Sequence, residues 1–376
     1  MLAHPDRHLL PNVPRVHFHD GGPGCPEDIP FPSVMRALME YLQKEDFGCG
    51  ALRGVKPRCR IPCSYAFFIG VTGVASFLNW KAGWEMDNVE IMYMSDEPAA
   101  PFARAFDAAG YGYTIHGPGG DPARHRAAIV SSIAAGRPVI AFGPIGPPEA
   151  ALVTGYDEDG DVLLGWSFFQ GFSELNPGVD REPTGEFRAR GWSAYAPGFS
   201  FITVGDEKER PPIEQTLRSS LAWMVRVART PVTFGDRANG LAAYEAWAAH
   251  LEQVDAGPSD EAILRQRHDA HNNLVGFLAE ARWYGSRFLV GMTIGGDDLV
   301  HRSAIGDLYA AAGLYAGEHA LMWRAWDLVG GNGNPEAWRK FADPTVRRAL
   351  AGVIREAGGK DAAAVERLGE VLARWR

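Results

Sequence analysis

The sequence contains little cysteine: four residues in 376, namely Cys25, Cys49, Cys59 and Cys63, all in the first 63 positions. So few cysteines exclude a disulfide-dense secreted scaffold. A structural zinc site is disfavoured as well, because three residues separate Cys59 from Cys63 and no Cys-x-x-Cys pair is present. Because the N-terminal stretch does not have the pattern of an export signal, we expect reduced thiols in a cytoplasmic protein.

Basic blocks and long apolar runs are also missing. The formal net charge is −9, and no run of roughly five or six lysines or arginines occurs, so we expect no nucleic-acid partner. The N-terminal stretch has prolines and histidines where a signal peptide has a continuous apolar run, so we expect no export. The most apolar run, Ala66 to Leu78, is shorter than the roughly 20 residues of a membrane span. It is typical of a core helix, and no membrane partner is expected.

The remaining composition, 46% apolar and 22% charged, is that of a globular protein. A chain of 376 residues is long for a single core, which favours two domains. Before residue 210, short β-rich runs (89–94, 111–115, 138–142, 150–156 and 161–166) alternate with the helical segments 101–110 and 123–136. Beyond it, apolar residues recur at helical spacing over 217–228, 241–251 and 308–315. The pattern predicts an α/β domain over 1–208, with an N-terminal extension over 1–44, and an all-helical domain over 209–376.

The clearest local signal is AALVTGYDEDGDVLLGW at 150–166. Its two apolar runs flank Asp159-Gly160, a pair suited to positive φ, which predicts a β-hairpin. The G-R-P at 136–138 is typical of a helix end followed by a strand. We expect one sheet that contains residues 139–142, 150–156 and 161–165, with a helix beginning at Cys63 packed against it.

A cysteine that opens an apolar helix, followed by GRPVI at 136–140 and ALVTGYDEDG at 151–160, resembles the papain-like bacterial cysteine peptidases that process bacteriocin leaders. The sequence is still more similar to the N-terminal domain of the butirosin biosynthesis acyltransferase, which uses the same fold for acyl transfer. The similarity covers residues 45 to 205 approximately. It implies an α+β papain-like (cysteine proteinase fold) domain.

In that family a cysteine at a helix N-terminus is joined by a histidine at the start of the strand leading to the Gly-Tyr, and by an aspartate or asparagine after the next strand. Cys63 matches the first position, but Glu149 stands where the histidine is expected. The third position falls near Trp166 and Ser167, and the glutamine that helps to bind the oxyanion is missing. The resemblance therefore implies a degenerate catalytic triad.

Cys63 has two interpretations. A helix N-terminus and the nearby Arg58 and Arg60 would lower the pKa of its thiol below about 8.5. Alternatively it is a buried, inert thiol, since free cysteines are among the most buried residues. Without a histidine to protonate the leaving group, an amide's amine departs poorly, whereas a thioester can still react.

Glu149, flanked by apolar residues, also has two interpretations. It is either an acid or base with a raised pKa or a solvated loop residue.

The histidines offer two further candidates. His116, in a glycine-rich loop at a strand end, is either a replacement site histidine or an exposed loop residue. His268 and His271 lie three apart on one predicted helix, and His319 is on another, which makes them weak metal candidates. The alternative is that these three are hydrogen-bonded or surface histidines, because the carboxylates of a di-iron bundle are absent. We expect no cofactor.

The helical half is rich in aromatic residues, which are predicted to form its core and its interface with the first domain. They are Trp223, Tyr244, Trp247, Trp283, Trp323 and Trp326.

Two functions remain open. The first is cysteine-dependent acyl transfer or hydrolysis on an amino-acid-derived or carrier-bound acyl group, with a small molecule, a peptide or an acyl carrier protein as partner. The second is a catalytically inactive relative that binds a small molecule or peptide in the same cleft. The candidate catalytic residues are Cys63, Glu149 and His116. Whether the chain is an enzyme is left open by the sequence, and a homodimer is compatible with it.

Overall fold

The computed structural model describes residues 6–16, 27–42, 63–176, 179–192, 199–253, 260–294, 302–331 and 333–375. Cys25, Cys49 and Cys59 lie outside these residues, as do Arg58 and Arg60, so the expectations for them stay predictions. The backbone of Cys63 is described but its side chain is not.

The chain divides into two compact units. The sheet unit consists of the described residues of Met1–Phe47 and Pro57–Tyr65 together with Phe106–Pro211. The helical unit contains Ala66–Ala105 and Pro212–Arg376. The division at Pro211 lies close to the boundary predicted from the change in sequence pattern. The assignment of Ala66–Ala105 to the helical unit was not foreseen.

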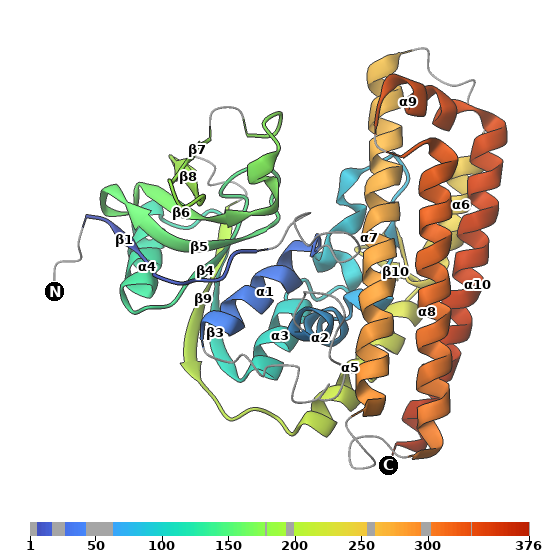
Figure 1. Cartoon of the computed structure of the whole chain (residues 1–376), viewed down its shortest axis with the longest axis horizontal. Helices are drawn as coiled ribbons and strands as arrows, with labels where there is room; N and C mark the ends of the chain where they lie inside the picture. The colour runs from blue at the N-terminus through green and yellow to red at the C-terminus, as the bar shows by residue number, and fades with distance from the viewer. Residues whose placement is uncertain are drawn as a thin grey trace. The chain divides into compact units, whose positions relative to one another are not determined.

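The sheet unit is built on an antiparallel sheet (Figure 1). Its strands run in the order β3-β9-β4-β5-β6-β8-β7, and β1 pairs with β5 beside this path. The three segments expected in one sheet are the neighbours β4, β5 and β6, so that prediction is confirmed. The strands are β1 (His8–Leu9), β3 (Tyr111–His116), β4 (Val139–Phe142), β5 (Ala150–Asp157), β6 (Val162–Ser167), β7 (Asp180–Arg181), β8 (Phe187–Arg190) and β9 (Ser200–Glu207).

The β5–β6 hairpin follows the predicted chemistry. Glu158, Asp159 and Gly160 all have positive φ (49°, 53° and 91°), so the turn is one residue wider than the predicted Asp-Gly pair. Gly155 of the same motif has a second role, because a Cβ there would lie 2.5 Å from the carbonyl oxygen of His8. Glycine therefore allows β1 to pair with β5 at this position.

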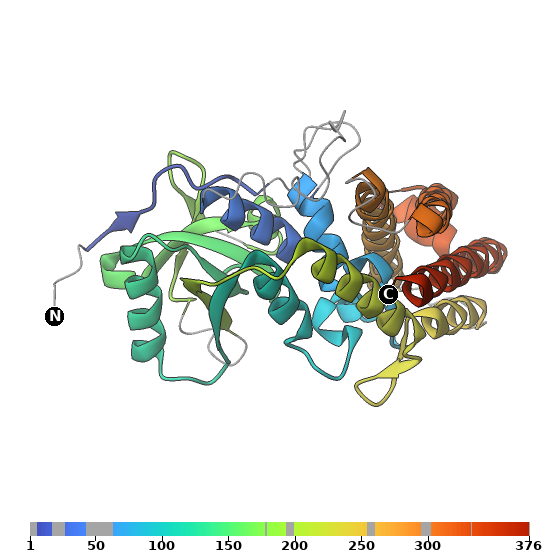
Figure 2. The same ribbon diagram turned by 90° about the horizontal axis from the view of Figure 1, so that it is seen from below.

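Two helices cover the sheet. Helix α4 (Pro122–Ala134) begins at the N-cap Asp121, whose side chain accepts a hydrogen bond from Ala123 N–H. Its Ile129 and Ile133 pack in one apolar cluster with strand residues such as Phe201. Helix α1 (Pro30–Tyr41) lies along β5, and Figure 2 shows it on the opposite side of the sheet from α4. Thus β1 and α1 make the predicted N-terminal extension part of the sheet unit.

The helical unit contains long helices that pack side by side. Helix α8 contacts both α7 and α10, and α6 lies against α10 (Figure 1). From Leu241 to Arg374 every described element is a helix, which confirms the predicted helical C-terminal stretch. The helices are α5 (Ile213–Arg229), α6 (Leu241–Glu252), α7 (Glu261–Ile294), α8 (Arg302–Val329), α9 (Pro335–Ala342) and α10 (Pro344–Arg374). Within the described chain, no helix has the length and apolar character needed to cross a membrane.

Earlier segments complete this unit. They are α2 (Cys63–Thr72) from Ala66 onward, the 3-10 helices η1 (Val74–Ser76), η2 (Met86–Val89) and η3 (Ile91–Met94), and the first residues of α3 (Ala100–Ala109). Short strands β2 (Asn79–Trp80), β10 (Val232–Thr233) and β11 (Arg237–Asn239) form a small antiparallel sheet, so the region 209–376 also contains strands.

The prediction of a strand over 89–94 is wrong, because Val89 ends η2 and the residues of η3 follow after Glu90. Ile91 and Met94 are both buried, and their spacing of three residues matches one turn of a 3-10 helix. The side chain of Asn88 fixes the preceding turn by accepting from Lys81 N–H and donating to Glu85 O. Such local bonds compete with a strand ladder.

The expected aromatic core is correct for only half of its members. Trp247, Tyr244 and Trp223 are buried. Trp323, however, is 42% exposed, and Trp283 and Trp326 are half-buried. The first three lie on α5 and α6, whereas the others lie on α7 and α8.

Candidate functional site

Helix α2 begins at Cys63, as predicted. Its first turn is anchored inside the sheet unit, because the hydroxyl of Tyr65 accepts a hydrogen bond of 3.2 Å from the backbone N–H of Ile29. Ser64 and Tyr65 are both buried. The free N–H groups of a first helical turn favour a negative charge, so this backbone position suits a thiolate.

A buried carboxylate lies at the start of α1. One oxygen of Glu27 accepts from the hydroxyl of Ser33 at 3.0 Å and from Nε of Arg36 at 2.8 Å. Its other oxygen has no hydrogen-bond partner among the described residues. Burial raises the pKa of Glu27 to about 7, although Arg36 acts in the opposite direction. Glu27 is therefore a group that exchanges a proton near neutral pH close to Ile29 and the start of α2.

The Arg36 side chain connects this carboxylate to β6. Its Nη1 donates to Glu40 at 2.8 Å, and its Nη2 donates to the backbone oxygen of Arg15 at 3.0 Å. The guanidinium of Arg15 in turn lies 5.4 Å from the ring centroid of Trp166. This network was not predicted from the sequence, although Ser33, Arg36 and Glu40 form a polar row at spacings of three and four in an otherwise apolar helix.

Glu149 lies immediately before β5. Its carbonyl oxygen accepts from Gly143 N–H at 3.2 Å and its own N–H donates to Pro147 O at 2.7 Å, which closes the β4–β5 loop. Burial raises the pKa of its carboxyl group to about 7, while a hydrogen bond from Ala150 N–H acts in the opposite direction. The side chain is half-buried, unlike a fully solvated loop residue. Glu149 is thus able to accept or donate a proton at neutral pH.

The third position of the implied triad carries no carboxylate. Ser167 pairs with Ala151, two residues along β5 from Glu149. The Ser167 hydroxyl accepts from Phe169 N–H at 3.2 Å, and the side-chain oxygen of Gln170 accepts from Ser167 N–H at 3.1 Å. This capping box uses the Ser167 side chain to start a 3-10 helix at Phe168–Gly171.

His116 ends β3, as predicted, but it is distant from Glu149. Strands β9 and β4 lie between β3 and β5, so three steps of about 4.8 Å separate the two strands by roughly 14 Å. The His116 ring stacks on Phe201 at 4.2 Å and its Nε2 is 3.0 Å from the hydroxyl of Thr203. Burial lowers the pKa of His116, and the nearby His125 lowers it further. The structure therefore places His116 in an aromatic contact and does not bring it to Glu149.

His268 and His271 lie on α7, and both are fully buried. His268 contacts Asp269 through Nδ1 at 3.1 Å and Asn272 through Nε2 at 3.3 Å. Neither nitrogen of His271 has a hydrogen-bond partner among the described residues. Burial lowers the pKa of His271 to about 3, so its ring is neutral. Its neighbours are the rings of Trp247 and Phe341.

His319 on α8 lies elsewhere along the same bundle. Its Nδ1 contacts the carbonyl oxygen of Ala279 at 2.8 Å, and its Nε2 accepts from the indole N–H of Trp323 at 3.0 Å. Ala279 is roughly 12 Å along α7 from His271 at the rise of a helix. Both nitrogens of His319 are thus engaged. Among the described residues, no group of three or more His, Cys, Asp or Glu side chains is arranged to hold a metal ion.

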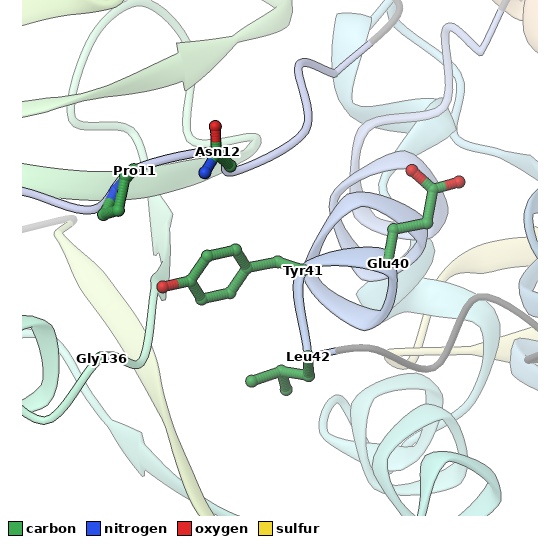
Figure 3. A pocket seen from close by; sticks show the side chains of 6 residues that line it. All are labelled: Pro11, Asn12, Glu40, Tyr41, Leu42 and Gly136. Carbon is green, nitrogen blue, oxygen red and sulfur yellow. The ribbon is translucent and has the colours of Figure 1, made fainter.

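A pocket of about 550 Å³ opens elsewhere on the sheet unit (Figure 3). Figure 3 shows the Tyr41 ring extending from the end of α1 toward the Gly136 turn, with Asn12 and Leu42 on either side. Gly136 precedes β4 at the end opposite to the β4–β5 loop. The pocket is therefore separate from the region of Glu149.

No protein-family model matches the chain, and no curated protein matches it in sequence. The chemistry open to this chain therefore follows from its own residues and from the geometry described above.

Proposed function

We propose that the sheet unit is a papain-like domain in which Cys63 performs acyl transfer or hydrolysis on an amino-acid-derived or carrier-bound acyl group. The observation that carries this proposal is the half-buried carboxyl group of Glu149 directly before β5, where the resembled family has its histidine, with a pKa that burial raises to about 7. It is supported by helix α2, whose first residue is Cys63 and whose first turn belongs to the same unit as β5. The order β4-β5-β6 also supports it.

The proposed chemistry assigns the proton to Glu149. Its carboxylate accepts the proton of the Cys63 thiol while the sulfur attacks the acyl carbonyl carbon and forms a C–S bond. The tetrahedral intermediate then collapses, the bond to the leaving group breaks, and Glu149 returns the proton to that group. Attack by an amine or by water on the resulting thioester completes transfer or hydrolysis and releases the Cys63 thiol.

The substrate class follows from the residues that replace the triad. A carboxylic acid with a pKa of about 7 is matched to proton transfer at neutral pH. It supplies no imidazolium cation to stabilise a thiolate, and Ser167 offers no carboxylate to orient a base. A leaving group that departs readily, such as the thiol of a thioester, therefore suits this site better than the amine of a peptide. An acyl group carried as a thioester, on a small thiol or on a carrier protein, is the substrate that we propose.

A second function, binding without turnover, is favoured by one observation. The Ser167 hydroxyl accepts from Phe169 N–H and the Gln170 side-chain oxygen accepts from Ser167 N–H, so both side chains serve local structure. A relative that has lost the third catalytic position in this way would keep a binding site for a small molecule or peptide and lose the reaction.

Acyl-enzyme trapping distinguishes the two functions. The full chain is incubated with a panel of aminoacyl thioesters of N-acetylcysteamine, and the intact mass is recorded at short times. We expect the mass to rise by one acyl group in the wild type, the adduct to map to Cys63, and the adduct to be absent in Cys63→Ser. In Glu149→Gln, Cys63 should be acylated at least tenfold more slowly at pH 7 than in the wild type. Binding of a thioester without any adduct at Cys63 would establish the second function and overturn the first.

A further inference from the structure

The core of the helical unit contains a charged cluster with no exposed side chain. Arg282 on α7 lies between Glu318 on α8 and Asp361 on α10, and all three have 0% exposure. Nε of Arg282 donates to Glu318 at 3.0 Å and its Nη2 donates to Asp361 at 3.0 Å. Tyr244 on α6 places its hydroxyl against both carboxylates and 2.9 Å from Nη2 of Arg282. We call these four residues the Arg282 cluster.

The same arginine holds η1. Its Nη1 donates to the backbone oxygens of Ala75 at 2.8 Å and Phe77 at 3.3 Å. Ser76 of η1 forms a hydrogen bond of 2.6 Å with the hydroxyl of Tyr315 on α8, whose ring lies 5.3 Å from the guanidinium carbon of Arg282. The segment that follows α2 is thus attached to the helices through groups of the Arg282 cluster and Tyr315.

Charge counting leaves the Arg282 cluster short of one positive charge. Arg282 contributes one cation, and two ionised carboxylates would contribute two anions. The tyrosines stay neutral, because burial raises the pKa of both Tyr244 and Tyr315. An uncompensated charge at a fully buried position is strongly unfavourable, and such a site binds a proton instead.

Hydrogen counting gives the same answer. The Tyr244 hydroxyl has one hydrogen, but it contacts Oε1 of Glu318 and also lies 3.1 Å from Oδ2 of Asp361. The five N–H groups of Arg282 are used by the contacts described above, so Arg282 supplies no further donor. One added proton on Oε1 of Glu318 completes the set: Glu318 donates to Tyr244, and Tyr244 donates to Asp361. A proton on Oδ1 of Asp361 would find no acceptor among the described residues.

We propose that Glu318 and Asp361 share one proton at neutral pH, and that its release at alkaline pH loosens the attachment of η1 to α7 and α8. The protonation state of the Arg282 cluster then controls how firmly η1 is attached within the helical unit. The titratable groups that face the shared proton are Tyr244 from α6, Arg282 from α7, Tyr315 from α8 and the two carboxyl groups themselves. Ser76 of η1 contributes a neutral hydroxyl.

The direction of the pH effect follows from linkage. Burial raises the pKa of Glu318 to about 8, and that of Asp361 is raised as well, so the folded state binds a proton that the unfolded chain releases at a lower pH. Stability from this group is fully present below the ordinary pKa of a glutamic acid and is lost as the pH rises to about 8. In that window the folded chain binds one more proton than the unfolded chain. Each rise of one pH unit therefore lowers the equilibrium constant for folding by up to tenfold.

The test uses the full chain and the variant Glu318→Gln, which keeps an oxygen for Arg282 and supplies a permanent amide donor toward Tyr244. Glu366→Gln, an exposed position on α10, is the matched control. Hydrogen exchange of the amides of residues 74–77 is measured from pH 6 to 9.5, corrected for the intrinsic pH dependence of exchange. We expect opening of η1 to increase at least tenfold over this range in the wild type and in Glu366→Gln. In Glu318→Gln the increase should be less than threefold.

Equal pH dependence of η1 opening in Glu318→Gln and the wild type would overturn the proposal. An infrared measurement on Glu27→Gln/Glu149→Gln, which lacks the two other carboxyl groups with raised pKa values, covers the case in which Glu318→Gln does not fold. The carbonyl stretching band of a buried protonated carboxyl group should be present in it at pH 6.5 and lost at pH 9.5. A spectrum without this band at pH 6.5 would also overturn the proposal.

Discussion

The hydroxyl of Tyr65 accepts a hydrogen bond of 3.2 Å from the backbone N–H of Ile29, and so the first turn of α2 is fixed to the residue that precedes α1. Both residues are buried. Cys63 lies two residues before Tyr65, on the same first turn. The position of the candidate nucleophile therefore depends on a contact within the sheet unit.

Removing this hydroxyl should weaken the sheet unit. Tyr65→Phe leaves the buried N–H of Ile29 without that acceptor, which costs about 1–3 kcal/mol of unfolding free energy. Urea titration measures the loss, and Tyr309→Phe, at a side chain that is 50% exposed, is the control expected to change stability by less than about 0.5 kcal/mol. If Tyr65→Phe were as stable as this control, the bond would not anchor α2.

The buried pair of Glu27 and Arg36 should behave as a coupled unit. Arg36→Met removes the cation from a carboxylate that has 0% exposure, and we expect a loss of about 3–5 kcal/mol at pH 8. Adding Glu27→Gln to that variant removes the unpaired charge, so the double variant should recover part of the loss. Additive effects in this double-mutant cycle would contradict a direct interaction.

His271 should make the helical unit sensitive to acid. Burial lowers the pKa of His271 to about 3, below that of a histidine in the unfolded chain, so its contribution to stability is present above pH 6.5 or so and is lost as the pH falls toward 3. In His271→Leu, unfolding free energy should therefore fall less between pH 7 and pH 4.5 than in the wild type. His8→Gln, on β1, serves as the control with an unchanged slope. Parallel pH curves for wild type and His271→Leu would count against this account.

His116 should be dispensable for the reaction. It lies on β3, separated from β5 by two strands, and its ring stacks on Phe201. His116→Phe keeps an aromatic ring at this position, so the rate of Cys63 acylation by an aminoacyl thioester should stay within twofold of the wild type. If the acylation rate fell more than tenfold while stability stayed normal, His116 would have to take part in the reaction.

Short sequence signals predicted the central strands of the sheet correctly. Features that depend on contacts between residues far apart in the sequence were not predicted. The Asp-Gly turn and the G-R-P signal act over a few residues, which is why β4, β5 and β6 were found. The division of α2 between the two units, after Tyr65, depends on contacts with Ile29 that have no local signature. The strand expected over 89–94 failed because the side chain of Asn88 stabilises a turn instead.

In the candidate site, too, some residues could be predicted from local sequence and others could not. Cys63 at a helix start and Glu149 at a strand start could be read from neighbouring residues. The Arg282 cluster could not, because its members come from four helices and no periodicity in a single helix indicates that they meet. The networks of Glu27 and of Glu318 depend on which polar side chains the fold encloses.

The most direct test of the central claim is the pH dependence of Cys63 alkylation by iodoacetamide in the wild type and in Glu149→Gln, with the labelled peptide identified by mass spectrometry. If Glu149 faces Cys63, its carboxylate raises the pKa of the thiol, and Glu149→Gln should lower that apparent pKa and increase labelling at pH 8. Alkylation expels iodide and needs no proton from Glu149, so this variant should be labelled faster although it transfers acyl groups more slowly. The surface variant Glu366→Gln should leave the profile unchanged. Identical profiles for wild type and Glu149→Gln, or no labelling of Cys63 below the unfolding transition, would contradict the account.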